Sequence, residues 1–456
     1  SIVGYFGVID INATAGTVKY VAEHQARGDD RQVSQVVTAA AVLHLCVGLL
    51  GAAVLYLGAG ALVTDVFRVE PHWRAEAEAT LRWSAAAFVV GQAQALLNSL
   101  PQALQRYDIV GRLDALFGTL VPVATLGVVA AGGSLVEIVQ VRLLVSVGHA
   151  ALLWRASRAL LPGLNWSRPG PGTAGRLLHF SAYSWLQRLA SLTSQNADKL
   201  LVGAQQSMAA LAAYGIPLTL CSRVFGLLYR LLQAVFPLAS ALQALGQMEQ
   251  LRRSSVMLQR YTLYLGVCAC LLCAGFAREL LHYWLQGRLP ETSAVVLVLV
   301  AFTLLVDSAT NVPSLVNDGL GRPHLTAAAS MLRAGLGVAA AAVSLALGDI
   351  VTLALSQLLV SAGVAAGFLW AVHRHSLPWR WRDVAGPVYG LNAAVLVAGT
   401  ALLAWRWHAP VLAPAAFAAA AALSATALAA VGWFAVLEPV HRRRALGWLG
   451  RRPLPR

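Results

Sequence analysis

Charged residues are scarce in this chain of 456 residues. Asp, Glu, Lys and Arg make up 12% of it, whereas hydrophobic residues make up 58%. Soluble domains carry roughly 25% charged residues, so the composition excludes a protein that lies mainly in water. Apolar runs of about 20 residues follow one another with short polar gaps, and each run is long enough to cross ~30 Å of hydrocarbon as a helix. The sequence therefore predicts an all-α, polytopic membrane protein.

Motifs for disulfides, metals, nucleotides and catalysis are also lacking. The five cysteines all lie in apolar segments, which excludes a disulfide framework. His373 and His375 have no helical metal-ligand spacing, and the glycine-rich residues 170–176 lack the Lys-Ser/Thr of a phosphate-binding loop. The net charge of +14 lies mostly in loops rather than on a basic face interleaved with aromatic residues, which argues against nucleic acid as a partner. We predict no catalytic residue, no metal site and no cofactor.

Thirteen transmembrane helices are predicted from the apolar runs. In chain order they cover residues 1–18, 34–57, 79–104, 114–132, 135–154, 177–202, 208–238, 261–281, 293–316, 324–347, 349–372, 388–408 and 411–437. Lys and Arg are concentrated in alternate loops and in the C-terminal tail, and such cations are retained in the cytoplasm. The C-terminus is therefore predicted to be cytoplasmic. Ser1 would then lie outside, which predicts one further helix upstream in a parent protein of 14 helices.

An internal repeat predicts two related halves. Residues 143–151 (LLVSVGHAA) recur as residues 358–366 (LLVSAGVAA), so that spans three to five match spans nine to eleven. A shift of six spans preserves orientation, as in the parallel repeats of some transporters. Chance similarity within Ala-, Leu- and Val-rich sequence is the alternative. The predicted parts are an N-terminal bundle at 1–160, a cytoplasmic linker at 161–176, a C-terminal bundle at 177–375, an extra helix pair at 376–437 and a basic tail at 438–456.

Polar side chains form stripes inside several predicted spans. In the sixth span they recur at spacings of three and four residues, which places them on one helix face. These residues are Ser181, Ser184, Arg188, Ser191, Gln195 and Asp198. The other spans contribute Asp10, Arg223, Arg230, Asp307, Asn311 and Arg333. A charge at mid-membrane costs at least ~2.5 kcal/mol, so these stripes should face a water-filled cavity or a protein partner rather than lipid.

The arginines in these stripes are candidates for binding an anionic headgroup, because the planar guanidinium can donate two parallel hydrogen bonds to a phosphate. They are Arg188, Arg223, Arg230 and Arg333. The alternative is that they pair with acids in the spans and lock helices together. Those acids, which are also candidates for binding a coupling proton or sodium ion, are Asp10, Asp198 and Asp307. The polar wall of the cavity is expected to include Ser184, Ser191, Gln195 and Asn311.

Two short motifs resemble the polysaccharide transporter family of flippases. Residues 196–203 (NADKLLVG) and 211–215 (LAAYG) are similar to that family's Asp-x-Leu-Leu-Leu-Gly and Leu-Gly-x-Tyr motifs, so that Asp198, Gly203 and Tyr214 carry over. Residues 4–23 resemble the end of the family's second helix and the segment after it. The family's superfamily also holds multidrug and toxin extrusion transporters and lipid II flippases.

The resemblance implies a flippase that moves a polyprenyl-pyrophosphate-linked oligosaccharide across the bacterial inner membrane by alternating access, in O-antigen or exopolysaccharide biosynthesis. Implied partners are the lipid-linked oligosaccharide, membrane lipids and a polysaccharide polymerase, and no enzymatic activity is implied. A lipid II flippase is one alternative. A multidrug-type cation antiporter is another, although organic cations favour carboxylates and aromatics over arginines. A membrane-embedded polysaccharide polymerase or ligase would need a sizeable outward loop, and the predicted outward loops are short.

Overall fold

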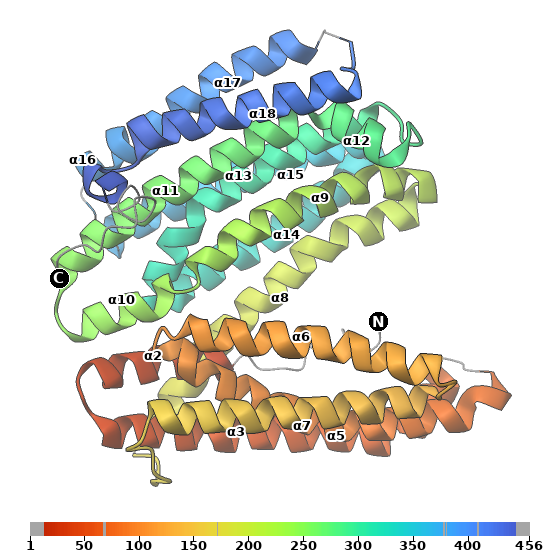
Figure 1. Cartoon of the computed structure of the whole chain (residues 1–456), viewed down its shortest axis with the longest axis vertical. Coiled ribbons are helices and arrows are strands. Elements are labelled where there is room, and N and C mark those ends of the chain that lie inside the picture. Colours follow the sequence, from red (N-terminus) through yellow and green to blue (C-terminus); the bar gives the residue numbers. More distant parts are fainter. Residues whose placement is uncertain are drawn as a thin grey trace. The chain divides into compact units, whose positions relative to one another are not determined.

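The computed structural model describes residues 13–66, 70–170, 172–376, 379, 381–407 and 410–443, and all regular elements in these ranges are helices (Figure 1). Ten segments are long and apolar enough to cross a membrane. They are Asp30–Leu57, Tyr107–Ala130, Leu135–Leu160, Ala209–Ala244, Met248–Gly275, Thr292–Gly319, Pro323–Leu347, Ile350–His375, Arg382–Leu403 and Pro414–Val436. These helices confirm the prediction of an all-α polytopic membrane protein.

The three other predicted spans fall on helices that are shorter or more polar. Helices α5 (Arg74–Ala103) and α8 (Thr173–Gln205) have 30 and 33 residues, enough to cross a bilayer, but polar side chains interrupt their apolar character. Helix α2 (Ala13–Ala26) covers the end of the first predicted span, and the rest of that span, with Asp10, lies outside the described residues. The total of thirteen spans stays a prediction.

Several helices begin well before the apolar runs that identified them. Helix α6 (Tyr107–Ala130) starts before residue 114, and α11 (Met248–Gly275) starts before residue 261. Arg252, which we predicted in a loop, therefore lies on α11, where its guanidinium is 2.6 Å from Glu249 Oε1 and also pairs with Asp383. Hydropathy marks the part of a helix that contacts lipid, whereas the polar turns beyond it remain helical in water.

The predicted span at 208–238 consists of two helices, α9 (Met208–Leu232) and α10 (Val235–Ala244). Pro237 has no N–H to donate to the carbonyl of Gln233, and its ring would clash with that carbonyl in a continuous helix. The interruption lies at this point of the chain, between Leu232 and Val235. Pro217, by contrast, lies within α9.

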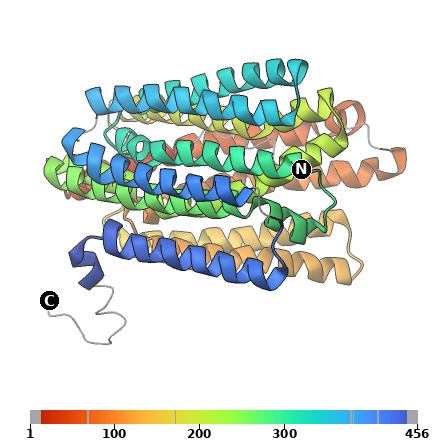
Figure 2. The same ribbon diagram turned by 90° about the horizontal axis from the view of Figure 1, so that it is seen from above.

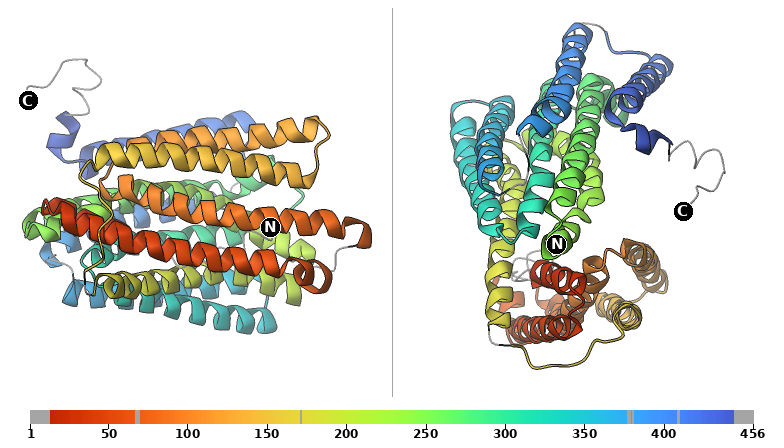
Figure 3. Two further views of the ribbon diagram at one scale, coloured as in Figure 1. Left: turned by 90° about the horizontal axis from the view of Figure 1, so that it is seen from below. Right: turned by 90° about the vertical axis from the view of Figure 1, so that its left-hand side faces the viewer.

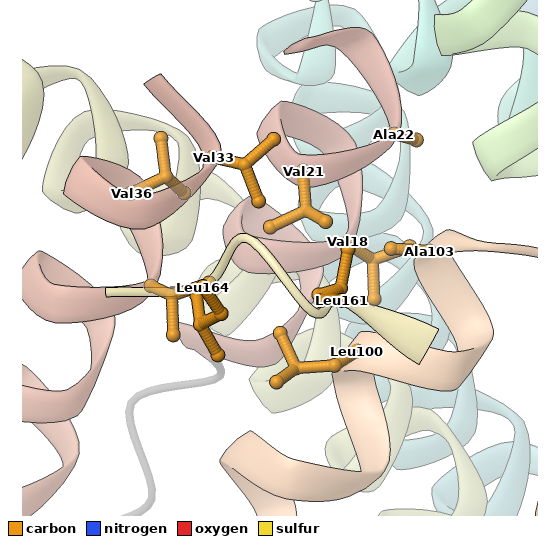
Figure 4. Close-up of a cluster of buried hydrophobic side chains, with 10 residues drawn as sticks. Val18, Val21, Ala22, Val33, Val36, Leu100, Ala103, Leu161 and Leu164 are labelled. Carbon is orange, nitrogen blue, oxygen red and sulfur yellow. The ribbon is translucent and has the colours of Figure 1, made fainter. Parts of the chain in front are cut away.

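The chain forms two compact units. Unit 1 consists of Ser1–Leu189, Phe236–Gln247 and Gly319–Pro323. Its long helices α3 (Asp30–Leu57), α5, α6 and α7 (Leu135–Leu160) run alongside one another, as both views in Figure 3 show. A cluster of buried apolar side chains joins α2, α3 and α5 to the segment after α7 (Figure 4). It consists of Val18, Val21, Ala22, Val33, Val36, Val37, Leu100, Ala103, Leu161 and Leu164.

Helix α10 and the turn 319–323 pack against each other within unit 1. The Ser240 hydroxyl donates to the carbonyl of Gly319 at 3.1 Å, and the Gln243 amide donates to the carbonyl of Leu320 at 3.3 Å. The backbones approach so closely that a β-carbon on Gly319 would lie 2.6 Å from Cβ of Ala239 and 2.9 Å from the carbonyl oxygen of Phe236. Glycine at position 319 is therefore required by the packing.

We expect Gly319→Ala to lower the unfolding temperature of the purified protein, with a cost in stability of about 1–3 kcal/mol for overpacking. Gly335→Ala is the matched control, because a β-carbon there meets nothing within 4 Å. Alanine is also a better helix former than glycine, so the control should leave stability unchanged or raise it. Equal unfolding temperatures for the two variants in a detergent thermal-shift assay would contradict the close packing at Gly319.

Unit 2 consists of Ala190–Val235, Met248–Asp318 and His324–Arg456. It holds the helices α9, α11, α12 (Ala277–Leu285), α13 (Thr292–Gly319), α14 (Pro323–Leu347), α15 (Ile350–His375), α17 (Leu391–Trp407) and α18 (Pro414–Val431). Figures 1 and 2 show α17 and α18, in blue, running alongside α11. The Tyr264 hydroxyl on α11 donates to the carbonyl of Leu428, and Arg406 on α17 pairs with the buried Glu279 of α12. The last two helices are thus tied to unit 2 by polar contacts.

Candidate functional site

The two family-like motifs meet at the corner between α8 and α9. Ser207 caps α9 by accepting a hydrogen bond from the amide of Ala210 at 3.1 Å, which fixes the start of this helix. The phenol of Tyr214 donates to Asp198 Oδ2 at 2.8 Å, and a β-carbon on Gly203 would lie 3.4 Å from the side chain of Leu211. The residues that carry the resemblance therefore hold this helical hairpin together.

A buried polar network extends from this corner to α14 and α15, within unit 2. The Gln357 amide on α15 donates to Asp198 Oδ1 at 3.1 Å and to the carbonyl of Gly337 at 2.9 Å. Its oxygen accepts from Arg333 Nη1 on α14 at 2.8 Å. Tyr214, Asp198 and Gln357 are only 1%, 6% and 6% exposed. Because buried polar groups are costly unless they are hydrogen-bonded, this network fixes how α8, α9, α14 and α15 pack.

The other end of the network is more open. Arg333 Nε lies 3.9 Å from Asp307 Oδ1 on α13, and the hydroxyl of Ser361 on α15 donates to the same carboxylate. The Asp307 side chain is 44% exposed, whereas the Arg333 side chain is 18% exposed. The network around Arg333 therefore links a buried carboxylate, Asp198, to a more exposed one, Asp307.

Tyr214→Phe tests the buried end of the network. The substitution removes one hydroxyl and leaves the buried Asp198 Oδ2 without its donor, so we expect a loss of about 1.5–3 kcal/mol in stability. Tyr56→Phe on α3 is the control, because Tyr56 is 54% exposed and its hydroxyl forms no hydrogen bond with the described residues. Thermal unfolding of both variants in detergent measures the difference. A Tyr214→Phe protein as stable as the wild type would show that this hydrogen bond contributes nothing to the α8–α9 corner.

Two of the candidate arginines lie exposed on α9. Arg223 and Arg230 are separated by seven residues, which is about two helical turns, so they lie along the same side of the helix. Neither side chain forms a hydrogen bond or an ion pair with the described residues. Asp198 and Asp307, by contrast, belong to the network around Arg333. This arrangement leaves two guanidinium groups on one helix available to an anion.

The remaining candidates lie partly elsewhere. Arg188 is exposed on the part of α8 that belongs to unit 1, and it has interactions within the protein. Ser184 is buried and donates to the carbonyl of Phe180 at 3.2 Å, whereas Ser191 is exposed. Asn311 is half-buried on α13, one turn after Asp307. The side chain of Gln195 and all of Asp10 lie outside the described residues. The headgroup and ion-coupling roles of all these residues stay predictions.

Gln357 and Ser361 belong to the network around Arg333 but were not predicted from the sequence as site residues. Both lie on α15, one turn apart, and Ser361 is within the repeated segment at residues 358–366. The signal was the one used for α8, namely polar residues spaced by four positions inside an apolar run. In the part of the chain that the structure describes, no group of three or more His, Cys, Asp or Glu side chains is placed to hold a metal ion.

Comparison with known proteins identifies both a family and a fold. Residues 5–285 match the family described as "Polysaccharide biosynthesis protein". A multidrug resistance MATE family transporter of the MOP superfamily in an outward-facing conformation is 14% identical, with a TM-score of 0.65 over 82% of this chain and 86% of that one. The Vibrio cholerae MATE transporter VcmN in the bent form is 15% identical, with a TM-score of 0.71 over 81% and 85%. The search of curated proteins gives no match.

Proposed function

Because this chain belongs to the polysaccharide biosynthesis protein family and has the fold of the MATE transporters, we propose that it is a flippase for a polyprenyl-pyrophosphate-linked oligosaccharide. The family and the fold make it a multi-pass membrane transporter of polysaccharide biosynthesis. Alternating access in the bacterial inner membrane, with a cytoplasmic C-terminus, belongs to the proposal. The concentration of arginine and lysine in alternate loops supports this orientation.

The exposed guanidinium groups of Arg223 and Arg230 are the observation that carries the choice of substrate. A cation inside a membrane span is costly unless it meets an opposite charge, and neither arginine meets one among the described residues. A pyrophosphate supplies two or more negative charges and oxygen atoms that match the guanidinium fork. An organic cation would be repelled at the same place. The arrangement therefore favours an anionic lipid-linked substrate over the substrates of a multidrug-type cation antiporter.

Asp307 is the group that we propose for ion coupling. Its carboxylate is accessible, lies 3.9 Å from Arg333 Nε and accepts from Ser361. A proton or a sodium ion bound there would neutralise the partner of Arg333 and change the packing of α13 against α14 and α15. Asp198, which is buried and held by Tyr214 and Gln357, would transmit that change to α8 rather than bind the ion itself.

Transport assayed in liposomes tests the proposed function. The protein is reconstituted with a fluorescent polyprenyl-pyrophosphate oligosaccharide, and the fraction accessible to an added reagent is followed with time. We expect substrate to appear in the opposite leaflet, and expression in a strain without its own oligosaccharide flippase should restore surface polysaccharide. Transport of lipid II alone would favour a lipid II flippase, and resistance to cationic drugs without transport of either lipid would favour an antiporter.

A further inference from the structure

The segment between α7 and α8 is held firmly to unit 1 although it is not helical. Leu161 and Leu164 are 4% and 7% exposed and lie in the cluster with Val18, Val33 and Leu100 (Figure 4). The backbone amides of Asn165 and Ser167 donate to the hydroxyls of Ser34 and Thr38 on α3, at 3.2 and 3.4 Å. Residues 161–170 therefore present their outward side chains at fixed positions, as a helix would.

A small groove, about 30 Å³ in volume, lies beside this segment. Leu96, Leu97 and Leu100 of α5 and Val37 of α3 line its inner side and are only 1–9% exposed. Trp154, Arg158 and Trp166 also line it, and these three side chains are exposed. The two indoles are 41% and 72% exposed. Exposed tryptophans next to an apolar surface at the end of a membrane-spanning helix are typical of the headgroup level of a bilayer. The two exposed indoles therefore fit the level at which lipid headgroups meet acyl chains.

Arg158 brings a positive charge to this groove, and two further arginines are close to it in the sequence. The Arg158 guanidinium lies 5.5 Å over the Trp154 ring and donates to the carbonyl of Leu164 at 2.7 Å. Arg155 is one turn earlier on α7, and Arg168 is two residues beyond Trp166; both are exposed. In the described residues none of these three arginines pairs with a carboxylate. Asp30, the acid beside this segment, lies next to Gly163 in a separate pocket.

We propose that this groove is a binding site for an anionic phospholipid, separate from the transport substrate. The phosphate would meet Arg158, with Arg155 and Arg168 close to it in the sequence, and the acyl chains would lie against the exposed indoles of Trp154 and Trp166. Basic pockets between helices on the cytoplasmic side of membrane proteins recognise such headgroups. The bound lipid would stabilise the segment that joins α7 to α8, and with it the connection between the halves of the chain.

Native mass spectrometry of the protein in a neutral detergent tests this proposal, with phosphatidylglycerol and phosphatidylcholine of equal chain length as probes. The wild type should retain phosphatidylglycerol in preference to phosphatidylcholine. Arg158→Gln should lower the retained phosphatidylglycerol at least fivefold. Trp166→Ala should do the same, and since this side chain is 72% exposed the variant keeps the fold.

Arg112→Gln is the matched control, because Arg112 is an exposed arginine near the start of α6, at the same end of the α6–α7 pair as the end of α7. It should retain phosphatidylglycerol like the wild type. A loss as large in the control would show that only overall charge attracts the lipid, and the proposal would fail. Displacement of phosphatidylglycerol by an equal concentration of a polyprenyl phosphate would also overturn it, since the groove would then bind the substrate's own lipid.

Discussion

Replacing both Arg223 and Arg230 by alanine should slow transport about a hundredfold without unfolding the protein. A hydrogen bond to a charged group is worth about 1.5–3 kcal/mol, and each 1.4 kcal/mol is a factor of ten in affinity. We therefore expect each single substitution to weaken transport about tenfold and the double substitution about a hundredfold. The liposome assay measures the rate, and the surface polysaccharide of a complemented strain should fall in parallel at matched expression.

The fold should tolerate these changes, because neither side chain holds a partner among the described residues. The unfolding temperature in detergent is therefore expected to stay close to that of the wild type. Arg112→Ala is the control for loss of charge on an exposed helix surface, and it should transport normally. Arg223→Lys keeps the charge but not the planar fork, so an intermediate rate would indicate phosphate recognition. Full transport by the double alanine variant would rule out these two arginines as the headgroup site.

The fold class could be predicted from the sequence because few backbone structures can span a bilayer. Every backbone polar group must be satisfied inside a span, so apolar runs of about 20 residues can only be helices. Helix ends were harder to place. Arg112 and Arg252 were predicted in loops and lie on α6 and α11, because the polar turns outside the membrane give no hydropathy signal.

The site was only partly predictable for a different reason. Periodicity shows which residues of one helix share a face, but it cannot show which helices are neighbours. The two family-like motifs identified Asp198 and Tyr214 from the sequence. The structure adds that the Tyr214 hydroxyl donates to Asp198 across the turn between α8 and α9. Arg333 was expected to face either phosphate or an acid, and the structure places it between Gln357 and Asp307.

Arg333→Met is expected to destabilise unit 2 by about 2–3 kcal/mol. The methionine fills much of the same volume but leaves the oxygen of Gln357 without its donor and Asp307 without its cation. Breaking a buried ion pair costs about 3–5 kcal/mol, and the value here should be smaller because the Asp307 side chain is 44% exposed. Thermal or urea unfolding of the purified protein measures the loss.

A double-mutant cycle with Asp307→Asn separates the pairing of Arg333 from a role in substrate binding. If Arg333 acts mainly through Asp307, the double variant should be more stable than the sum of the single effects predicts, because no unpaired carboxylate remains. The rate of transport by the double variant should then no longer depend on pH or sodium. The affinity of the double variant for the lipid-linked oligosaccharide should stay unchanged. Additive losses in stability, together with a weaker affinity in Arg333→Met alone, would instead assign Arg333 to the headgroup and leave Asp307 as an independent ion-binding candidate.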